Sequence, residues 1–386
     1  MSGRRRHRTL NPVDDSSTVD DYQKAGLYDP DAPGSADRLA LLEYLTEIGF
    51  GIDEMRTAAT TASLHAMPVD SLRARRTVLT TKDMAERTGL DVEQLIEVRR
   101  AAGLAPVGPD VAVYEEADVD AFATLIRASK LFSWSALMQL LRVVGSSAAR
   151  IADAANALFL HDVENPMRTA GAGELELAKQ GAEAMELADG LTSVFSLYTR
   201  LHLGQAVSRS RQAAAPAGPS PTVWMAVGFV DLVGFTPKAS ELDPAGLADL
   251  VARFEATAHD LITDLGGRLV KLIGDEVMFV AVEASTGCDI AVALLQTFGA
   301  SPALTPRGGL AYGPVLARSG DYYGPTVNLA SRLTDAAVPG EVLATPEVSL
   351  AAATHHRVEA AGRRQLKGFA EPVAVVSLTA EPLTLA

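Results

Sequence analysis

The sequence predicts an α+β protein, in which a mostly α-helical N-terminal domain precedes a domain of alternating strands and helices. In the first part of the 386 residues, leucines recur at three- and four-residue spacing, which is typical of amphipathic helices. A stretch rich in Ala, Pro and Ser follows at 208–222 and indicates a linker. Beyond it, short apolar runs bounded by glycine alternate with amphipathic segments. A chain of this length ordinarily forms two or three domains.

The N-terminal half begins with a polar segment that contains several prolines and glycines. An apolar stripe then starts with Leu39, Leu42 and Leu45, and similar stripes continue to about residue 208. Val111–Tyr114 is the best strand candidate in this region. We therefore expect four segments: a flexible tail at 1–36, a helical domain at 37–208, a linker at 209–222 and a C-terminal domain at 223–380.

One segment of the helical domain, Thr80–Leu104, resembles a helix-turn-helix of the MerR type. Thr80 or Thr81 is expected to cap the first helix, and Gly89 to form the turn. The segment contains four basic and five acidic residues, and this balance is unfavourable for binding the phosphate backbone of DNA. The charges favour a helix-turn-helix that serves as a packing unit.

The C-terminal domain opens with a buried strand, after which helices and strands follow in a regular order. The pattern predicts a strand at Val223–Val230, a helix at Pro244–Leu265, a hairpin of Arg268–Ile273 and Glu276–Val282, a helix at Asp289–Phe298, a strand at Gly308–Gly313 and a helix at Val327–Ala337. Strand, helix, strand, strand, helix and strand is the order of a ferredoxin-like fold.

Two aspartates stand at the ends of apolar strands in this domain. Asp231 follows the first strand, and Asp275 lies at the tip of the predicted hairpin next to Gly274. Two carboxylates brought close together repel each other, and such a pair is a suitable site for divalent cations, which prefer oxygen ligands. Taken singly, each aspartate also fits a turn or a helix cap.

Four motifs in a fixed order add to this interpretation. They are FVDLVGFT at Phe229–Thr236, GRLVKLIGDEVMF at Gly267–Phe279, YGPTVNLASRL at Tyr323–Leu333 and LKGFAEPV at Leu366–Val373. In sequence and order they resemble the conserved segments of class III nucleotidyl cyclases, and the resemblance covers about residues 222–380. It implies that Asp231 and Asp275 hold two divalent cations, Mg²⁺ or Mn²⁺, in each site.

The same resemblance assigns the substrate-binding residues. Lys271 and Asp321 match the two positions that select the purine, and this pair implies ATP as the substrate. Asn328 matches the residue that orients the ribose, and Arg332, four positions further on the same helix face, matches the arginine that stabilises the transition state. Lys367 matches a lysine that binds the triphosphate.

The resemblance thus implies an adenylate cyclase that forms 3′,5′-cyclic AMP and pyrophosphate by two-metal catalysis. In this family each site draws its carboxylates from one chain and its purine, ribose and transition-state residues from the other, so a head-to-tail homodimer is expected. The helical domain is expected to regulate this assembly. The sequence does not identify its effector, and pH and a lipid are the two candidates. His65, His161 and His202 lie in that domain. A one-component DNA-binding regulator with a nucleotide-binding cyclase-like domain is the alternative.

Composition limits the classes of partner and the compartment. The net charge is −14, which disfavours nucleic acid and anionic membranes as main partners. The longest apolar run, Val223–Val230, is far shorter than the about 20 residues of a membrane-spanning helix. Arg4–Arg6 are followed by polar residues, so no secretion signal is expected. With Cys288 as the single cysteine, an intrachain disulfide is excluded, and we expect a cytoplasmic location.

Overall fold

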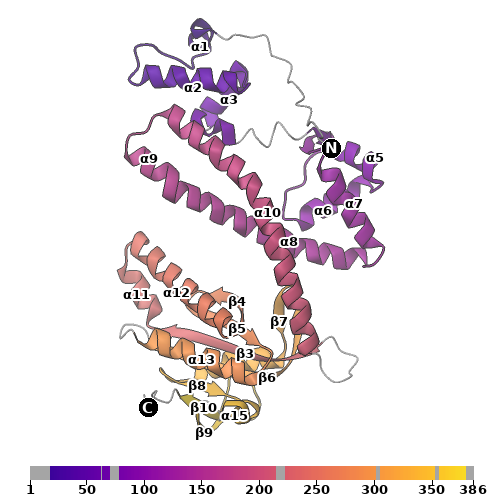
Figure 1. The fold of residues 1–386 in the computed structure, drawn as a ribbon, viewed down its shortest axis with the longest axis vertical. Helices are drawn as coiled ribbons and strands as arrows, with labels where there is room; N and C mark the ends of the chain where they lie inside the picture. Colours follow the sequence, from indigo (N-terminus) through magenta and orange to yellow (C-terminus); the bar gives the residue numbers. More distant parts are fainter. Residues whose placement is uncertain are drawn as a thin grey trace, which may run out of the picture. The chain divides into compact units, whose positions relative to one another are not determined.

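The computed structural model divides into two compact units, Met1–Tyr198 and Thr199–Ala386, which are described one at a time (Figure 1). None of its described helices is both long enough and apolar enough to cross a membrane. The residues that the structure describes are 18–61, 63–69, 78–213, 222–300, 305–352 and 356–379.

The first unit consists mainly of helices and contains a small two-stranded antiparallel sheet. Its last helix, α10, continues into the second unit. The elements are α1 (Val19–Lys24), α2 (Ser35–Glu47), α3 (Ile52–Thr61), the short η1 (Leu64–Ala66), β1 (Leu79–Thr80), α5 (Thr81–Thr88), α6 (Val92–Ala101), β2 (Ala112–Tyr114), α7 (Asp118–Ser129), α8 (Trp134–Phe159), η2 (Leu160–Glu164), α9 (Asn165–Thr169) and α10 (Glu174–Gln212).

The expectation of a flexible tail is wrong for residues 19–36. Helix α1 packs on α2 through Tyr22, which is buried beside Leu41 and Leu45. The Tyr22 hydroxyl lies 2.6 Å from Oγ1 of Thr46. The segment is mostly polar, and for that reason it was expected to be flexible. Its few apolar side chains are nevertheless sufficient to anchor it to the helical core.

The predicted helix-turn-helix is present, with the expected cap and turn. Thr80 accepts a hydrogen bond from the backbone N–H of Asp83 at 3.1 Å, and Gly89 ends α5 with a φ of 77°, a conformation that glycine adopts without strain. Helix α6 follows, and its Leu95 is buried against Met84 of α5.

Two of the four cations of this motif form ion pairs within the chain, and a third, Arg99, donates to the Ala105 carbonyl at 2.7 Å. Lys82 pairs with Asp110 at 2.6 Å, and Arg87 pairs with Glu116. One turn after Leu95 on α6, Val98 packs against Leu137 and Met138 of α8. These contacts leave few free cations for DNA phosphates, and they favour the packing role that the charge balance indicates.

The second unit has the predicted ferredoxin-like order at its centre. Its strand order is β4, β5, β3, β6, continued by β8, β10 and β9, with β7 paired to β6. The elements are β3 (Thr222–Val233), α11 (Phe235–Glu241), α12 (Pro244–Asp264), β4 (Arg268–Ile273), β5 (Glu276–Ala281), α13 (Ala284–Gly299), β6 (Thr305–Arg318), β7 (Asp321–Tyr323), α14 (Pro325–Ala336), β8 (Val342–Ala344), α15 (Pro346–Ala352), β9 (Arg357–Arg364) and β10 (Val373–Thr379).

The predicted linker at 209–222 is only partly consistent with the structure. Helix α10 runs to Gln212, and Ala213 is buried against Met225. The backbone carbonyl of Ala213 accepts a hydrogen bond from the N–H of Trp224 at 3.0 Å. Residues 214–221 lie outside the described residues. The end of α10 is therefore fixed to the second unit by packing and by a backbone hydrogen bond.

The central sheet is covered by α12 and α13 on one face and by α14 on the other. Because side chains alternate along a strand, β3 presents Val230 and Leu232 to α12 and α13, and Val227 and Phe229 to the side of α14. Asp231 continues the second series. The sheet therefore directs this carboxylate toward the face on which α14 lies.

Candidate active site

Three charged side chains stand at one level of the sheet. Asp231 is directly opposite Glu276 of β5 on one side and Arg307 of β6 on the other. Neighbouring strands are about 5 Å apart, so side chains in register on one face interact directly. The antiparallel register of three strands that are distant in sequence therefore creates this cluster.

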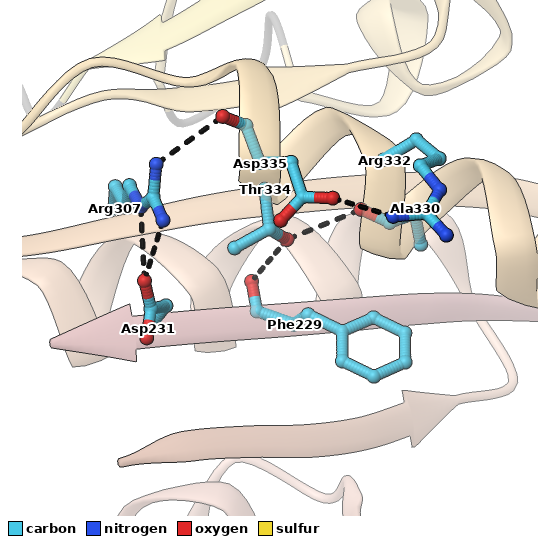
Figure 2. Close-up of polar contacts among 7 residues, drawn as sticks. All are labelled: Phe229, Asp231, Arg307, Ala330, Arg332, Thr334 and Asp335. Atoms are coloured by element: carbon cyan, nitrogen blue, oxygen red, sulfur yellow. Dashed lines mark hydrogen bonds and ion pairs between the residues drawn. The ribbon is translucent and has the colours of Figure 1, made fainter. Parts of the chain in front are cut away.

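Arg307 joins two elements of the site (Figure 2). Its Nε and Nη2 atoms donate to the same oxygen of Asp231 at 2.9 Å and 2.8 Å, and its Nη1 donates to the backbone carbonyl of Asp335 at 3.2 Å. Asp335 lies in the last turn of α14. A single guanidinium therefore connects the strand that carries Asp231 to the helix that carries Asn328 and Arg332.

Asp275 is brought to the same place by the turn between β4 and β5. Gly274 has a φ of 66°, and the backbone N–H of Leu232 donates to the Asp275 carbonyl at 3.3 Å. Burial raises the pKa of the Asp275 carboxyl, and the negative charge of Asp231 contributes to the same shift. The two predicted carboxylates are thus close enough to interact.

The pKa of the Glu276 carboxyl is raised even more than that of Asp275. Burial, together with the charges of Asp231, Asp335 and Asp275, raises the pKa of Glu276 to about 7. The guanidinium of Arg307 opposes this shift and is the one cation among the causes. The cluster therefore has more acidic than basic groups, which is the electrostatic condition that favours a bound cation.

The donor set fits a magnesium or manganese ion that has substrate ligands as well. Within the described ranges there is no group of three or more His, Cys, Asp and Glu side chains able to enclose a metal ion. Mg²⁺ usually takes one or two carboxylates, and phosphate and water oxygens fill its other positions. Asp231 and Asp275 fit that pattern.

The two residues predicted to select the purine are in direct contact. Nζ of Lys271, on β4, lies 2.6 Å from Oδ2 of Asp321, which begins β7. The backbone N–H of Tyr322 donates to the other oxygen of Asp321 at 2.8 Å. Arg268, on the same strand as Lys271, supports β7 by donating to the Gly320 carbonyl at 2.9 Å. Residues 50 positions apart are thus held together.

Asn328 and Arg332 lie one turn apart on α14, as expected. Asn328 is exposed, and Arg332 is partly exposed and forms an ion pair with Asp335 at 2.7 Å (Figure 2). Lys367 is exposed in the segment between β9 and β10. Helix α14 therefore offers both side chains to the surface.

One chain brings the predicted residues together as separate pairs. Asp231 lies with Asp275, and Lys271 with Asp321, whereas Arg332 pairs within its own helix. Among the described residues, no hydrogen bond or ion pair joins Arg332 or the Lys271–Asp321 pair to Asp231 or Asp275.

Sequence reasoning missed Glu276 and Arg307. Glu276 is adjacent to Asp275 in the sequence, so its position at the strand start was a usable signal. Arg307 precedes the glycines of the next strand and shares no motif with Asp231. Its role depends on the register of β3 with β6, which no local pattern reveals.

Two family models match the chain, one in each half. The model of the adenylate cyclase regulatory domain matches residues 20–206, and that of the adenylate and guanylate cyclase catalytic domain matches residues 219–379. An uncharacterised protein of Mycobacterium tuberculosis is 35% identical over 95% of this chain and 96% of its own length.

Two relatives have descriptive names. An adenylate cyclase of Streptomyces coelicolor is 36% identical over 67% of this chain and 68% of its own length. A pH-sensitive adenylate cyclase of Mycobacterium tuberculosis is 30% identical over 92% of this chain and 90% of its own length. Among solved structures, an adenylyl cyclase from P. aeruginosa covers 43% of this chain and 98% of its own at 24% identity, with a TM-score of 0.39.

Proposed function

The chain belongs to the adenylate and guanylate cyclase family, and on that premise we propose that it converts ATP to 3′,5′-cyclic AMP and pyrophosphate. The observation that carries the choice of ATP is the 2.6 Å contact between Lys271 and Asp321. A lysine donates and a carboxylate accepts, which suits the ring nitrogen and the exocyclic amino group of adenine. Guanine presents a carbonyl oxygen where adenine has its amino group, and Asp321 cannot donate to it.

The remaining residues are assigned to the reaction in turn. Asn328 orients the ribose so that its 3′-oxygen is aligned with the α-phosphorus. That oxygen bonds to the phosphorus and loses its proton to water, while the bond to the bridging oxygen breaks and pyrophosphate leaves. Arg332 donates to the α-phosphoryl oxygens as their charge grows, and Lys367 binds the triphosphate.

Asp231 and Asp275 would hold the two divalent cations of each site. Bound cations would acidify the ribose hydroxyl and neutralise phosphate charge. The excess of negative charge around Asp275 and Glu276 supports this assignment, since carboxylates that destabilise one another gain most from a cation.

Each site would be shared between two chains in a head-to-tail homodimer. Support comes from the separation of the pairs within one chain, where Arg332 is bound to Asp335 and Asp231 to Arg307. In a symmetric pair, α14 of one chain would complete the carboxylate site of the other. A catalytic unit that stays monomeric would then be inactive, whereas two shortened chains that pair would keep both sites.

Cyclic AMP formation by the purified full-length chain, with ATP and either Mn²⁺ or Mg²⁺, tests the proposal. We expect activity that Asp231→Asn or Asp275→Asn lowers by at least about a hundredfold. Asp249→Asn is the matched control, because Asp249 is exposed on α12 away from these carboxylates. No cyclic nucleotide from either metal, together with a shift of labelled DNA, would favour the DNA-binding alternative.

The helical unit is proposed to regulate this activity by changing how two catalytic units meet. It contributes none of the residues assigned to the reaction. A ligand or proton shifts such an equilibrium only by binding one arrangement better than the other, and a tenfold effect requires about 1.4 kcal/mol. We expect a chain that begins near residue 212 to be more active than the full chain.

Initial rates of the full and shortened chains should be compared from about pH 5.5 to 8. The comparison requires concentrations at which both are dimers. Different specific activities, with a flatter pH response in the shortened chain, would support regulation. Superimposable curves would leave the helical unit as a scaffold.

A further inference from the structure

The strand that carries Asp321 has little support of its own. Strand β7 has three residues, and among the described strands it pairs with β6 alone. The two residues of the preceding turn, Ser319 and Gly320, have φ values of 54° and 81°. Positive φ at both positions is typical of a type I′ hairpin turn, but it is unfavourable for serine, which has a Cβ. The carboxylate assigned to adenine therefore follows a strained turn at the start of a short strand.

Arg268 supports this hairpin from a different strand, β4. Its Nη2 donates to the Gly320 carbonyl at 2.9 Å, and its Nη1 donates to the Tyr322 hydroxyl at 3.3 Å. Its guanidinium carbon also lies 5.7 Å from the centre of the Tyr322 ring, within the range of a cation–π contact. Gly320 and Tyr322 are the two chain neighbours of Asp321. A single guanidinium therefore binds the chain on both sides of Asp321.

A β-bulge explains how Arg268 and Lys271 reach the same hairpin. Side chains alternate along a strand, so residues three positions apart ordinarily point to opposite faces. In β4 the register with β5 shifts by one residue between Leu269 and Lys271, and a bulge of this kind redirects the side chains that follow it. Strand β4 thus provides both the direct partner of Asp321 and the support of its strand.

We propose that Arg268 is a positioning residue for purine selection, which holds Gly320 and Tyr322 so that the Asp321 carboxylate stays where the adenine amino group binds. This inference rests on the proposed function, which assigns Lys271 and Asp321 to the base. The side chains of Lys271 and Asp321 are 41% and 24% exposed, and partly exposed ion pairs contribute little free energy.

Lys271 also has a second task in the proposed function, because it donates to a ring nitrogen of adenine. Its contact with Asp321 is therefore shared with the substrate. The hydrogen bonds of Arg268 go to a backbone carbonyl and a tyrosine hydroxyl, neither of which is assigned to the base. The support that Arg268 gives to β7 is thus the same with and without a nucleotide.

Equilibrium binding to the full-length chain tests this role. The probes are 3′-deoxy-ATP and 3′-deoxy-GTP with Mn²⁺, which lack the attacking hydroxyl and so cannot be cyclised. We expect Arg268→Ala to raise the Kd of the ATP analogue about 3- to 10-fold and that of the GTP analogue less than about twofold. Arg268→Lys keeps the charge but not the planar fork, so its effect should be intermediate.

Arg253→Ala is the matched control for the loss of a guanidinium. Arg253 is exposed on α12, and among the described residues no hydrogen bond or ion pair joins it to β7. Both Kd values should stay close to those of the unaltered chain. A similar rise in the Kd of both analogues in Arg268→Ala would overturn the role in purine selection.

A double variant shows whether Arg268 acts through Asp321. In a chain that already carries Asp321→Ala, the further change Arg268→Ala should alter the Kd of 3′-deoxy-ATP by less than about twofold, because the contact that Arg268 positions is already lost. If the two changes raise the Kd independently, so that their effects multiply, Arg268 does not act through Asp321 and the proposal is wrong.

Hydrogen exchange separates this inference from the proposed function. The backbone N–H of Tyr322 donates to the Asp321 carboxylate at 2.8 Å, so exchange of the β7 amides reports whether that carboxylate is held. Without nucleotide, Arg268→Ala should speed this exchange at least about tenfold relative to Arg253→Ala. The measurement supports the anchoring even if no cyclic AMP is formed and neither analogue binds. Equal exchange in the two variants would overturn it.

Discussion

At the scale of single residues, the contact between Lys271 and Asp321 leads to a prediction about the choice between ATP and GTP. Asp321→Ala removes the proposed acceptor for the adenine amino group, so kcat/KM for ATP should fall by about 10- to 100-fold. The kcat/KM for GTP should change much less, because Asp321 cannot donate a hydrogen bond to the guanine carbonyl and so contributes little to GTP binding. Both nucleotides are measured with the same metal.

Tyr323→Phe is the control for that experiment, since it removes a polar group from the same short strand, β7. Its ratio of ATP to GTP activity should stay close to that of the unaltered chain. An unchanged ratio in Asp321→Ala would show that the base is selected elsewhere.

The buried position of His65 leads to a prediction about how the stability of the helical unit depends on pH. Its Nε2 lies 2.9 Å from Nη2 of Arg168, which can only donate, so Nε2 accepts and the proton stands on Nδ1. Nδ1 is buried without a hydrogen-bond partner in the described part of the chain. Burial, aided by the charge of Arg168, lowers the pKa of His65 below its usual 6.5.

Because the folded pKa is the lower one, the unfolded chain binds this proton more readily. The free energy of unfolding should therefore fall as pH drops through 6.5, by at most about 1.4 kcal/mol per pH unit. Hydrogen exchange of the α2 backbone from pH 7.5 to 5.5 measures it. His65→Gln keeps an acceptor that does not titrate, and its dependence should be flatter; parallel curves would contradict this account.

The sequence placed those candidate site residues that belong to a recognisable motif. Asp231, Asp275, Asn328 and Arg332 stand on the predicted elements, because strand ends and helix spacing are local properties. Glu276 and Arg307 gain their roles only from the pairing of β3 with two other strands. Side-chain contacts across a sheet depend on register, which the chain sets globally.

At the scale of elements, the contact between β6 and α14 determines where Asn328 and Arg332 lie. A Cβ on Gly309 would overlap the carbonyl of Ala330 and the backbone nitrogen of Thr334. Gly309→Ala should therefore push the helix outward, lower the free energy of unfolding by about 1–3 kcal/mol and slow catalysis.

Thermal unfolding and initial rates of the same preparation check this prediction. Gly299→Ala is the matched control, because its Cβ would meet Pro306 at an ordinary 3.7 Å. We expect that control to keep both properties. A Gly309→Ala protein with full activity would mean that α14 tolerates displacement.

Element boundaries followed the sequence wherever glycine or proline marked them. The hairpin at 268–281 and the start of α12 after Asp243 are within a residue of expectation. Strand β6 was predicted at 308–313 but spans 305–318, and β7 to β10 were not predicted at all. Several of these strands are short or polar, so they lack the periodicity that identified the others.

At the scale of the whole molecule, sharing of sites predicts complementation. Mixing Asp231→Ala with Arg332→Ala chains should restore activity, because a mixed dimer has one intact site and one with both lesions. Random exchange makes about half of the dimers mixed with one working site of two, so about a quarter of the normal rate should return.

The mixture must be shown to exchange subunits, for example by mass spectrometry of the mixed dimer. Each variant alone should be inactive and dimeric. An exchanged mixture without activity would contradict the shared site.

Arg307 gives such a dimer a means of communication. Arg307 binds Asp231 and the end of α14, and in the proposed dimer Asp231 would serve one site and Arg332 of α14 the other. Binding of ATP at one site would draw Asp231 toward that site. Because Arg307 links Asp231 directly to α14, this movement would change the position of Arg332 in the neighbouring site. The two sites should not titrate independently: ATP saturation should deviate from a simple hyperbola, and Arg307→Lys, which lacks the fork, should return the Hill coefficient toward one.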